Sequence, residues 1–129
     1  MILVDSSVWI DFFNGKEEEH VEKLYELLGN KVLVTGDLIL VEVLQGFKND
    51  KQFQIAKEAL ESLPYFSLCS KETALLSAEH YRLLRKKGVT IRKTIDVIIA
   101  TFCINNNIKL LHHDKDFSDM EKYLGLQAV

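Results

Sequence analysis

Short apolar runs alternate with helical patterns along the whole chain. The apolar runs have the length and residue types of buried β-strands, and they are residues 2–4, 32–34, 65–68, 109–111 and, at the end of the chain, 126–129. The stretches between them carry apolar residues at spacings of three and four. Strands that alternate with helices form parallel sheets, so the pattern predicts an α/β fold with helices covering a central sheet.

Several of the helical patterns have recognisable ends. One helix is predicted over 21–28, where apolar residues keep helical spacing up to a Gly-Asn stop. Residues 37–47 and 52–60 predict two further helices, which form a helical arm before the third strand. Thr94 is expected to cap a strongly apolar helix over 95–104.

Another helix is predicted to end at Gly88 and to combine an apolar stripe with basic sides. We expect the stripe to face the core, and its members are Ala74, Leu75, Ala78, Tyr81 and Leu84. The last helix is expected to begin at Ser118, because Ser118 and Glu121 have the spacing of a capping box.

The composition fits one domain. The chain has 129 residues, 47% of them hydrophobic, without repeats or linkers, so residues 1–129 are expected to form a single domain. The sequence shows no signal peptide and no segment near the ~20 apolar residues of a membrane span. Cys69 and Cys103 stand far apart, which suits two buried free thiols in a reducing compartment. A cytoplasmic protein with no membrane partner is therefore expected.

Four acids occupy positions that suggest a shared site. Ligands of parallel α/β sheets bind beyond the carboxyl ends of the strands. Asp5 directly follows the first apolar run, and Asp114 comes shortly after the fourth. Glu42 and Asp96 lie within apolar helical stretches that would pack beside the sheet. Each acid alone also has a structural explanation, as a helix cap, a partner of a helix dipole, an exposed helical residue or a turn residue.

Together, the four carboxylates indicate a cation site. Held within several ångströms, they would repel one another by roughly 3 to 4 kcal/mol per close pair at an effective dielectric constant near 20. Oxygen ligands favour Mg²⁺ or Mn²⁺ over Zn²⁺, and such an ion activates water for phosphodiester hydrolysis. The net charge of −3 does not exclude RNA as a partner, because the surface without these four acids is slightly basic.

The segments that hold these acids also carry a family resemblance. They read Ile-Leu-Val-Asp-Ser-Ser-Val-Trp-Ile-Asp-Phe at 2–12, Val-Glu-Val-Leu-Gln-Gly at 41–46, Gly-Val-Thr-Ile-Arg-Lys-Thr-Ile-Asp-Val-Ile-Ile-Ala at 88–100 and Leu-Leu-His-His-Asp-Lys-Asp-Phe at 110–117. In this order they resemble the PIN-domain family, in particular the VapC toxins of type II toxin–antitoxin pairs. The resemblance implies a three-layer fold whose central five-stranded parallel sheet is flanked by helices. It also implies a homodimer that can enter a larger toxin–antitoxin assembly.

The activity implied by the resemblance is that of an endoribonuclease. It would depend on Mg²⁺, with Mn²⁺ able to substitute, and a cognate antitoxin would restrain it. The family's catalytic and metal-binding quartet maps onto Asp5, Glu42, Asp96 and Asp114. Asp5 and Asp96 are expected to bind metal directly, while the other two complete the metal shell or orient the attacking water.

Neighbouring positions complete the family pattern with one departure. Asp116 matches a fifth acid found in many members, and Ser7 matches a hydroxyl residue that supports the first acid. Many relatives have threonine at the position of His112, so hydrogen bonding around the acids differs here. Five basic residues are candidates for holding the RNA backbone, although a solvated surface explains them equally well. They are Arg82, Arg85, Lys86, Arg92 and Lys93.

Histidines and aromatic residues add little to the predicted site. His112 and His113 do not predict a zinc site, because adjacent strand-end residues point in different directions and no third soft ligand has a suitable spacing. Trp9, Phe12 and Phe13 are at helical spacing, which favours contacts in the core or a dimer interface over stacking with bases.

Three other functions agree less well with the sequence. An aspartyl-phosphate phosphatase normally has a second aspartate where this chain has Ser7. A receiver domain needs an acidic pair near the first strand and a lysine at a strand end, and neither is convincing here. The complete quartet disfavours a PIN scaffold that only binds RNA or protein.

Antitoxin contacts are predicted on the helical arm at 38–60, where apolar residues exceed what a small core needs.

Overall fold

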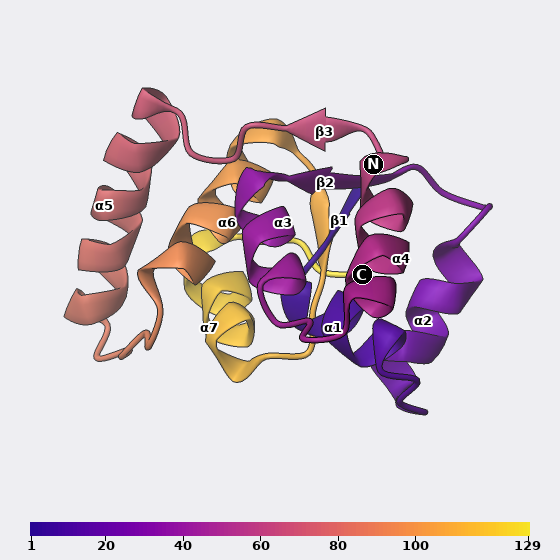
Figure 1. Ribbon diagram of the computed structural model, residues 1–129. Helices are drawn as coiled ribbons and strands as arrows, with labels where there is room; N and C mark the ends of the chain where they lie inside the picture. Colours follow the sequence, from indigo (N-terminus) through magenta and orange to yellow (C-terminus); the bar gives the residue numbers. More distant parts are fainter.

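Four parallel strands form the central sheet of the protein, and a computed structural model describes all residues from 1 to 129. The strands are β1 (Ile2–Val4), β2 (Leu33–Gly36), β3 (Tyr65–Phe66) and β4 (Lys109–Leu111). Their order across the sheet is β3-β2-β1-β4 (Figure 1). β1 and β4 pair in register from Ile2 with Lys109 to Val4 with Leu111. The two central strands β2 and β1 thus lie between strands from later parts of the chain.

The predicted fifth strand is wrong. Residues 126–129 form only an isolated parallel bridge between Leu110 and Ala128. Two backbone hydrogen bonds hold it: Leu110 N donates to Gln127 O at 3.0 Å, and Val129 N donates to Leu110 O at 3.1 Å. The segment follows directly on Gly125, whose left-handed backbone ends the last helix. One bridged residue extends the sheet, but it is not a strand.

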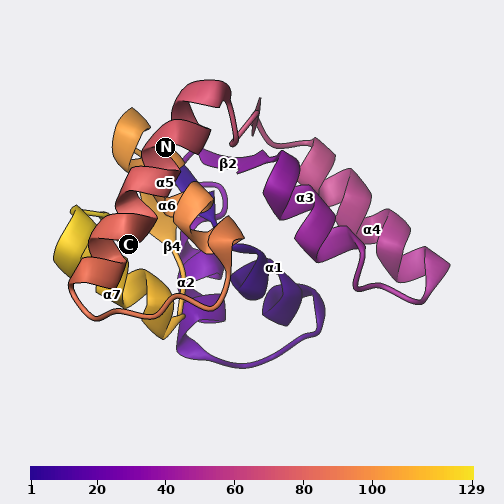
Figure 2. The same ribbon diagram turned by 90° about the vertical axis from the view of Figure 1, so that its left-hand side faces the viewer.

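Seven helices surround the sheet. They are α1 (Ser6–Phe13), α2 (Glu19–Leu27), α3 (Asp37–Leu44), α4 (Asp50–Glu61), α5 (Lys71–Lys86), α6 (Thr94–Asn106) and α7 (Lys115–Leu124). Figure 2 shows α3 and α4 on one side of the sheet and α6 and α7 on the other, while α5 packs on α6. The predicted α/β fold with a parallel sheet between helical layers is confirmed. No helix combines the length and apolar character that crossing a membrane requires.

Two predicted helix starts are wrong. α7 begins at Lys115 and not at Ser118, because the Asp114 side chain accepts a hydrogen bond from Asp116 N at 2.9 Å and so caps the helix. Thr94 is the first residue of α6 and not its cap; the capping position is held by Lys93, whose side chain makes no capping bond. Both helices therefore start earlier in the chain than the sequence pattern indicated.

The predicted core face of α5 is also partly wrong. Leu84 is fully buried, but Leu75 is 62% exposed, and Ala74 and Ala78 are exposed as well. The buried positions on this helix include Thr73 and Ser77. Their polar atoms are satisfied, since Ser77 Oγ donates to Thr73 O at 2.6 Å. A hydroxyl group that forms a hydrogen bond with the helix backbone can be buried at a small cost in free energy. A prediction from apolar residues alone therefore misses the buried side of this helix.

The free cysteines differ in burial. Cys103 is fully buried in α6, as predicted, whereas Cys69 is exposed, so its predicted burial is wrong. Cys69 lies in the turn between β3 and α5, outside any apolar helix face. Trp9 is buried, and the ring centroids of Phe12 and Phe13 lie 5.7 and 5.8 Å from its own. These aromatic residues of α1 pack against the core, as the sequence predicts.

Gly36 marks a close approach between β2 and the chain after β3. A Cβ atom at this position would lie 2.6 Å from Phe66 O and would overlap Leu68 Cγ. Gly36 is also the residue before α3, so the same close approach sets where α3 leaves the sheet. Asp37 reinforces this corner, because its Oδ1 accepts hydrogen bonds from Leu38 N and Leu68 N, both at 2.9 Å.

Candidate active site

The pairing of β1 with β4 brings two of the predicted acids side by side. Asp5 follows β1 and caps α1, and its backbone N donates to Leu111 O of β4 at 3.0 Å. Asp114 follows β4 and caps α7. Each acid thus lies beyond the carboxyl end of a parallel strand and at the start of a helix, where the helix dipole favours negative charge.

The other two predicted acids reach the same place from helices. Asp96 lies in the first turn of α6 and is only 4% exposed, and the partly buried Glu42 lies on α3. A cavity of about 230 Å³ joins all four acids, and we call it the acidic cavity. Its lining residues are Asp5, Ser6, Ser7, Ile10, Glu42, Gln45, Lys93, Asp96 and Asp114.

Two adjacent serines of α1 hold two of the acids in place. Ser7 donates to Asp5 Oδ2 from both its hydroxyl and its backbone N, the latter at 3.2 Å. Ser6 Oγ donates to Glu42 Oε1 at 2.9 Å and so connects α1 with α3. The sequence indicated a supporting role for Ser7 but missed Ser6. In the sequence, only the two adjacent hydroxyl residues could have indicated this role. Which acid each serine contacts depends on how α1 is rotated about its axis, and the sequence does not specify that rotation.

Burial and mutual repulsion disfavour the charged forms of these acids. Burial raises the pKa of Asp5, although hydrogen bonds from Ser7 oppose the change. Burial, and then the charge of Asp5, raise the pKa of Asp96 from its ordinary value of 3.8 to about 7. Burial also raises the pKa of Glu42, against the hydrogen bond from Ser6. Without a cation, this cavity therefore holds protons that ordinary carboxyl groups would release.

The acidic cavity fits a divalent cation. Asp5 Oδ1 is buried and has no hydrogen-bond partner, which leaves a free ligand atom inside the site. Among the lining residues, Lys93 alone is basic. Its charge opposes the rise in the pKa of Asp96 and Glu42 but does not cancel it. One ammonium group does not balance four carboxylates. Donors that are all carboxylate oxygens suit Mg²⁺ or Mn²⁺.

Asp116 lies beside the acidic cavity but does not line it. Its Oδ2 is 3.3 Å from Arg92 Nε, and it also accepts a bond from Arg92 N at 3.4 Å. Arg92 Nη2 in turn lies 3.3 Å from both oxygens of Asp114. Arg92 thus connects Asp116 with the Asp114 carboxylate.

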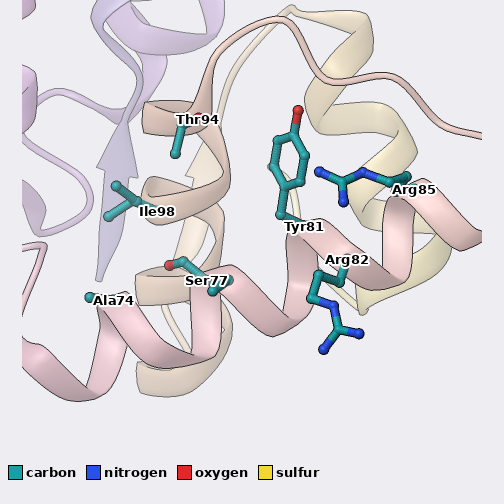
Figure 3. A pocket seen from close by; sticks show the side chains of 8 residues that line it. Ala74, Ser77, Tyr81, Arg82, Arg85, Thr94 and Ile98 are labelled. Carbon is teal, nitrogen blue, oxygen red and sulfur yellow. The ribbon is translucent and has the colours of Figure 1, made fainter.

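The five basic candidates for RNA contacts lie in different places. Lys93 lines the acidic cavity, Arg92 is held at its edge by Asp114 and Asp116, and Lys86 is exposed near the end of α5. Arg82 and Arg85 line a second, open cavity of about 360 Å³ between α5 and α6. Figure 3 shows Arg85 beside Tyr81 and Arg82 directed away. The guanidinium carbon of Arg85 lies 5.3 Å from the centre of the Tyr81 ring.

The two adjacent histidines separate as expected, but one of them gains partners that the sequence did not reveal. His112 is inside, with Nε2 2.8 Å from Glu121 Oε2. His113 points the other way and stacks on His20, beside Asp11. The sequence offers no third soft ligand at a suitable spacing, but α1 and α2 bring Asp11 and His20 close to His113 in the fold.

We expect the metal-free protein to lose thermal stability between about pH 4 and pH 7. The pKa of Asp96 is about 7 in the folded chain and 3.8 ordinarily, so the folded state binds more protons between these values. The resulting stabilisation is complete below about pH 4 and is lost as the pH rises through 7. Melting curves in EDTA would measure it. If Asp96→Asn shows the same slope as the wild type, Asp96 is not the group responsible.

The fold and the cavity define a class of protein, namely a parallel α/β domain with a carboxylate site beyond the carboxyl ends of its strands. The chain belongs to the PIN-domain family, whose sequence profile matches residues 2–123. Ribonuclease VapC1 of Methanocaldococcus jannaschii is 30% identical over 98% of this chain and 85% of that protein. The chain is thus a homologue of VapC ribonucleases.

Solved structures agree in fold. VapBC2 from Rickettsia felis, bound to a DNA fragment from its promoter, matches with a TM-score of 0.78 at 21% identity and covers 100% of this chain and 98% of its own. A toxin–antitoxin complex from Klebsiella pneumoniae matches with a TM-score of 0.72 at 21% identity, covering 92% of this chain and 91% of its own. At 21% identity, these matches support the fold alone. The chemistry has to be argued from the residues of the acidic cavity.

Proposed function

We propose that this protein is a divalent-metal-dependent endoribonuclease and the toxin of a toxin–antitoxin pair. The observation that carries the proposal is the meeting of Asp5, Glu42, Asp96 and Asp114 in one cavity of a PIN fold. The proposed cation is Mg²⁺, with Mn²⁺ able to replace it. RNA is the proposed substrate because the relatives of this chain are ribonucleases by name.

Each acid has a proposed role that follows from its surroundings. Asp5 and Asp96 are the deepest, and Asp5 Oδ1 is free of other bonds, so these two would hold the cation directly. Glu42 and Asp114 would complete the shell or orient the attacking water. When bound, a divalent cation acidifies water and offsets the charge of the scissile phosphate.

The other residues of the cavity position these groups. Ser7 and Ser6 fix the carboxylates of Asp5 and Glu42, and Arg92 fixes that of Asp114. Lys93 offers an ammonium group at the cavity wall that can bind a phosphate oxygen of the RNA. Water attacks the phosphorus in line, the bond to the 3′ oxygen breaks, and that oxygen takes up a proton. The products are a 5′-phosphate and a 3′-hydroxyl.

The proposed protein partners are a cognate antitoxin and a second copy of the chain. One structural match is itself a toxin–antitoxin complex by title. The helical arm at 38–60 supports an antitoxin contact, because Val41 is 59% exposed on α3 and Ile55 is 53% exposed on α4. Apolar side chains this exposed on neighbouring helices are typical of a surface that another protein covers.

The proposal is tested by cleavage of total cellular RNA with purified protein in Mg²⁺, Mn²⁺ or EDTA. We expect fragments only with metal, and none from Asp5→Asn, because the free oxygen inside the cavity is lost. Asp50→Asn is the matched control, since Asp50 is an exposed acid at the start of α4. Ligation to the new 5′ ends would check for the 5′-phosphate.

Two outcomes would contradict this proposal. Fragments that persist in Asp5→Asn, or in EDTA, would mean a contaminating nuclease or a different site. No cleavage by any form, together with RNA binding by the wild type, would favour a scaffold that binds RNA without cutting it.

A further inference from the structure

A second cluster of ligand-type side chains lies outside the acidic cavity. Asp11 comes from α1, His20 from α2 and His113 from the loop between β4 and α7. One potential ligand atom from each residue lies within 4.8 Å of the other two. Asp11 and His20 are buried, whereas His113 is exposed. Side chains from three separate segments thus converge at one point of the surface.

The two imidazole rings share a single carboxylate oxygen. Asp11 Oδ2 is 2.7 Å from His20 Nε2 and 3.6 Å from His113 Nε2. The rings stack with their centroids 3.8 Å apart and their planes at 7°. Since 3.6 Å exceeds a hydrogen bond, His113 Nε2 faces the carboxylate without a bond of its own. A cation between these three atoms would use both ring nitrogens and the shared oxygen.

Charged side chains flank the cluster. Lys16 Nζ lies 3.3 Å from Asp11 Oδ1, so it engages the oxygen that the histidines leave free. Glu18 Oε2 lies 3.6 Å from His20 Nδ1. Histidine ligands of metals commonly direct their second ring N–H toward such a carboxylate.

We propose that Asp11, His20 and His113 bind one Zn²⁺ ion. Two imidazole nitrogens and one carboxylate oxygen form a ligand set that zinc accepts with water in the fourth position, whereas Mg²⁺ prefers oxygen ligands alone. The exposed ring of His113 gives the ion a path to the site and can turn to improve the geometry. This zinc site is distinct from the acidic cavity, whose polar ligand atoms are mainly carboxylate oxygens.

The zinc site has a structural connection to the acidic cavity. His113 directly precedes Asp114, and Asp11 lies on the helix that Asp5 caps. A zinc ion would therefore join α1 and α2 to the segment that carries Asp114. We expect Zn²⁺ to raise the melting temperature of the full chain through these three attachments.

The experiment is a calorimetric titration of the purified full chain with Zn²⁺ in excess Mg²⁺, which keeps the acidic cavity occupied. We expect one equivalent to bind, and His113→Gln to weaken binding at least about tenfold, since even loss of an outer partner of a metal ligand costs this much. His80→Gln is the matched control, because His80 lies on α5 and contacts Thr101 at 2.8 Å. Asp96→Asn should leave zinc binding unchanged.

The outcomes separate a metal site from an ordinary ion pair. One zinc ion bound at least about tenfold more weakly by His113→Gln, and bound with unchanged affinity by His80→Gln and Asp96→Asn, supports the proposal. Visible absorption of bound Co²⁺ that follows the same pattern also supports it. Absence of binding to the wild type overturns the proposal. So does an affinity that is unchanged in His113→Gln, or binding that disappears in Asp96→Asn. Because His113 is exposed, its replacement should leave the melting temperature in Mg²⁺ unchanged, which verifies that the variant is folded.

Discussion

Asp96→Asn is expected to reduce metal-dependent RNA cleavage by about 10³-fold while the metal-free protein stays at least as stable as the wild type. The reduction is at the upper end of what the loss of one catalytic electrostatic group costs. Stability is retained because the wild-type carboxylate is buried beside Asp5, which raises its pKa to about 7. Asparagine has the same shape and carries no charge, so it removes the repulsion without leaving a hole.

The two halves of this prediction need separate measurements. Initial rates of cleavage of a fluorescent RNA in Mg²⁺ give the activity, and urea denaturation in EDTA at pH 8 gives the stability. Asp50→Asn controls for the same chemical change in the first turn of another helix, where the side chain is exposed. A variant that loses activity only because it unfolds would show a lower urea midpoint, and that result would contradict the prediction.

Gly36→Ala is expected to lower the free energy of unfolding by about 3 kcal/mol, the upper end of the usual cost of overpacking. The added methyl group would lie 2.6 Å from the backbone oxygen of Phe66 and would overlap the side chain of Leu68. The backbone oxygen belongs to β3 and cannot rotate away, so β2 and β3 must separate. Because Gly36 precedes α3, the strain also reaches the helix that carries Glu42.

Gly46→Ala provides the comparison. Its added Cβ would lie 3.6 Å from Val43 O, an ordinary contact, so we expect a change within about 1 kcal/mol. The midpoints of urea unfolding for the two variants and the wild type would measure both effects. Equal midpoints for Gly36→Ala and Gly46→Ala would show that the corner between β2 and α3 adapts more easily than its close contacts indicate.

The acids were predictable from the sequence because their positions depend on chain order. Asp5 and Asp114 come just after strands, and all strands of a parallel sheet end at the same edge. The partners of these acids were harder to predict. Ser6 reaches Glu42, and Arg92 reaches Asp114, through the rotation of a helix and the path of a loop. Neither of these follows from spacing along the sequence.

The wrong predictions have physical causes of the same kind. Residues 126–129 have strand-like composition, but a strand requires a run of paired neighbours, and only Ala128 forms a bridge. The inner face of α5 was predicted from its apolar residues alone. The helix instead buries Thr73 and Ser77, whose hydroxyl groups form hydrogen bonds. The cluster of Asp11, His20 and His113 could not be predicted because His20 and His113 lie 93 positions apart in the sequence, and only the fold brings them together.

Structural and functional explanations of the acids also proved compatible. Asp5 and Asp114 cap the helices α1 and α7, and both also line the acidic cavity. Asp96 likewise sits in the first turn of a helix. Three helices thus direct their positive ends toward one cavity, which partly offsets the cost of gathering carboxylates there. Alanine at Asp5 or Asp114 would therefore remove a cap and a candidate ligand together, and asparagine is the better replacement.

The pairing of β1 with β4 also bears on the order in which a ribosome makes this protein. β1 is synthesised before its neighbour β4, which follows more than 100 residues later, and Asp114 comes after that. Until that part of the chain has emerged, half of the sheet around β1 is missing and the acidic cavity has no wall formed by Asp114. A nascent chain that ends before Asp114 therefore lacks one acid of the cavity, and we expect it not to cleave RNA.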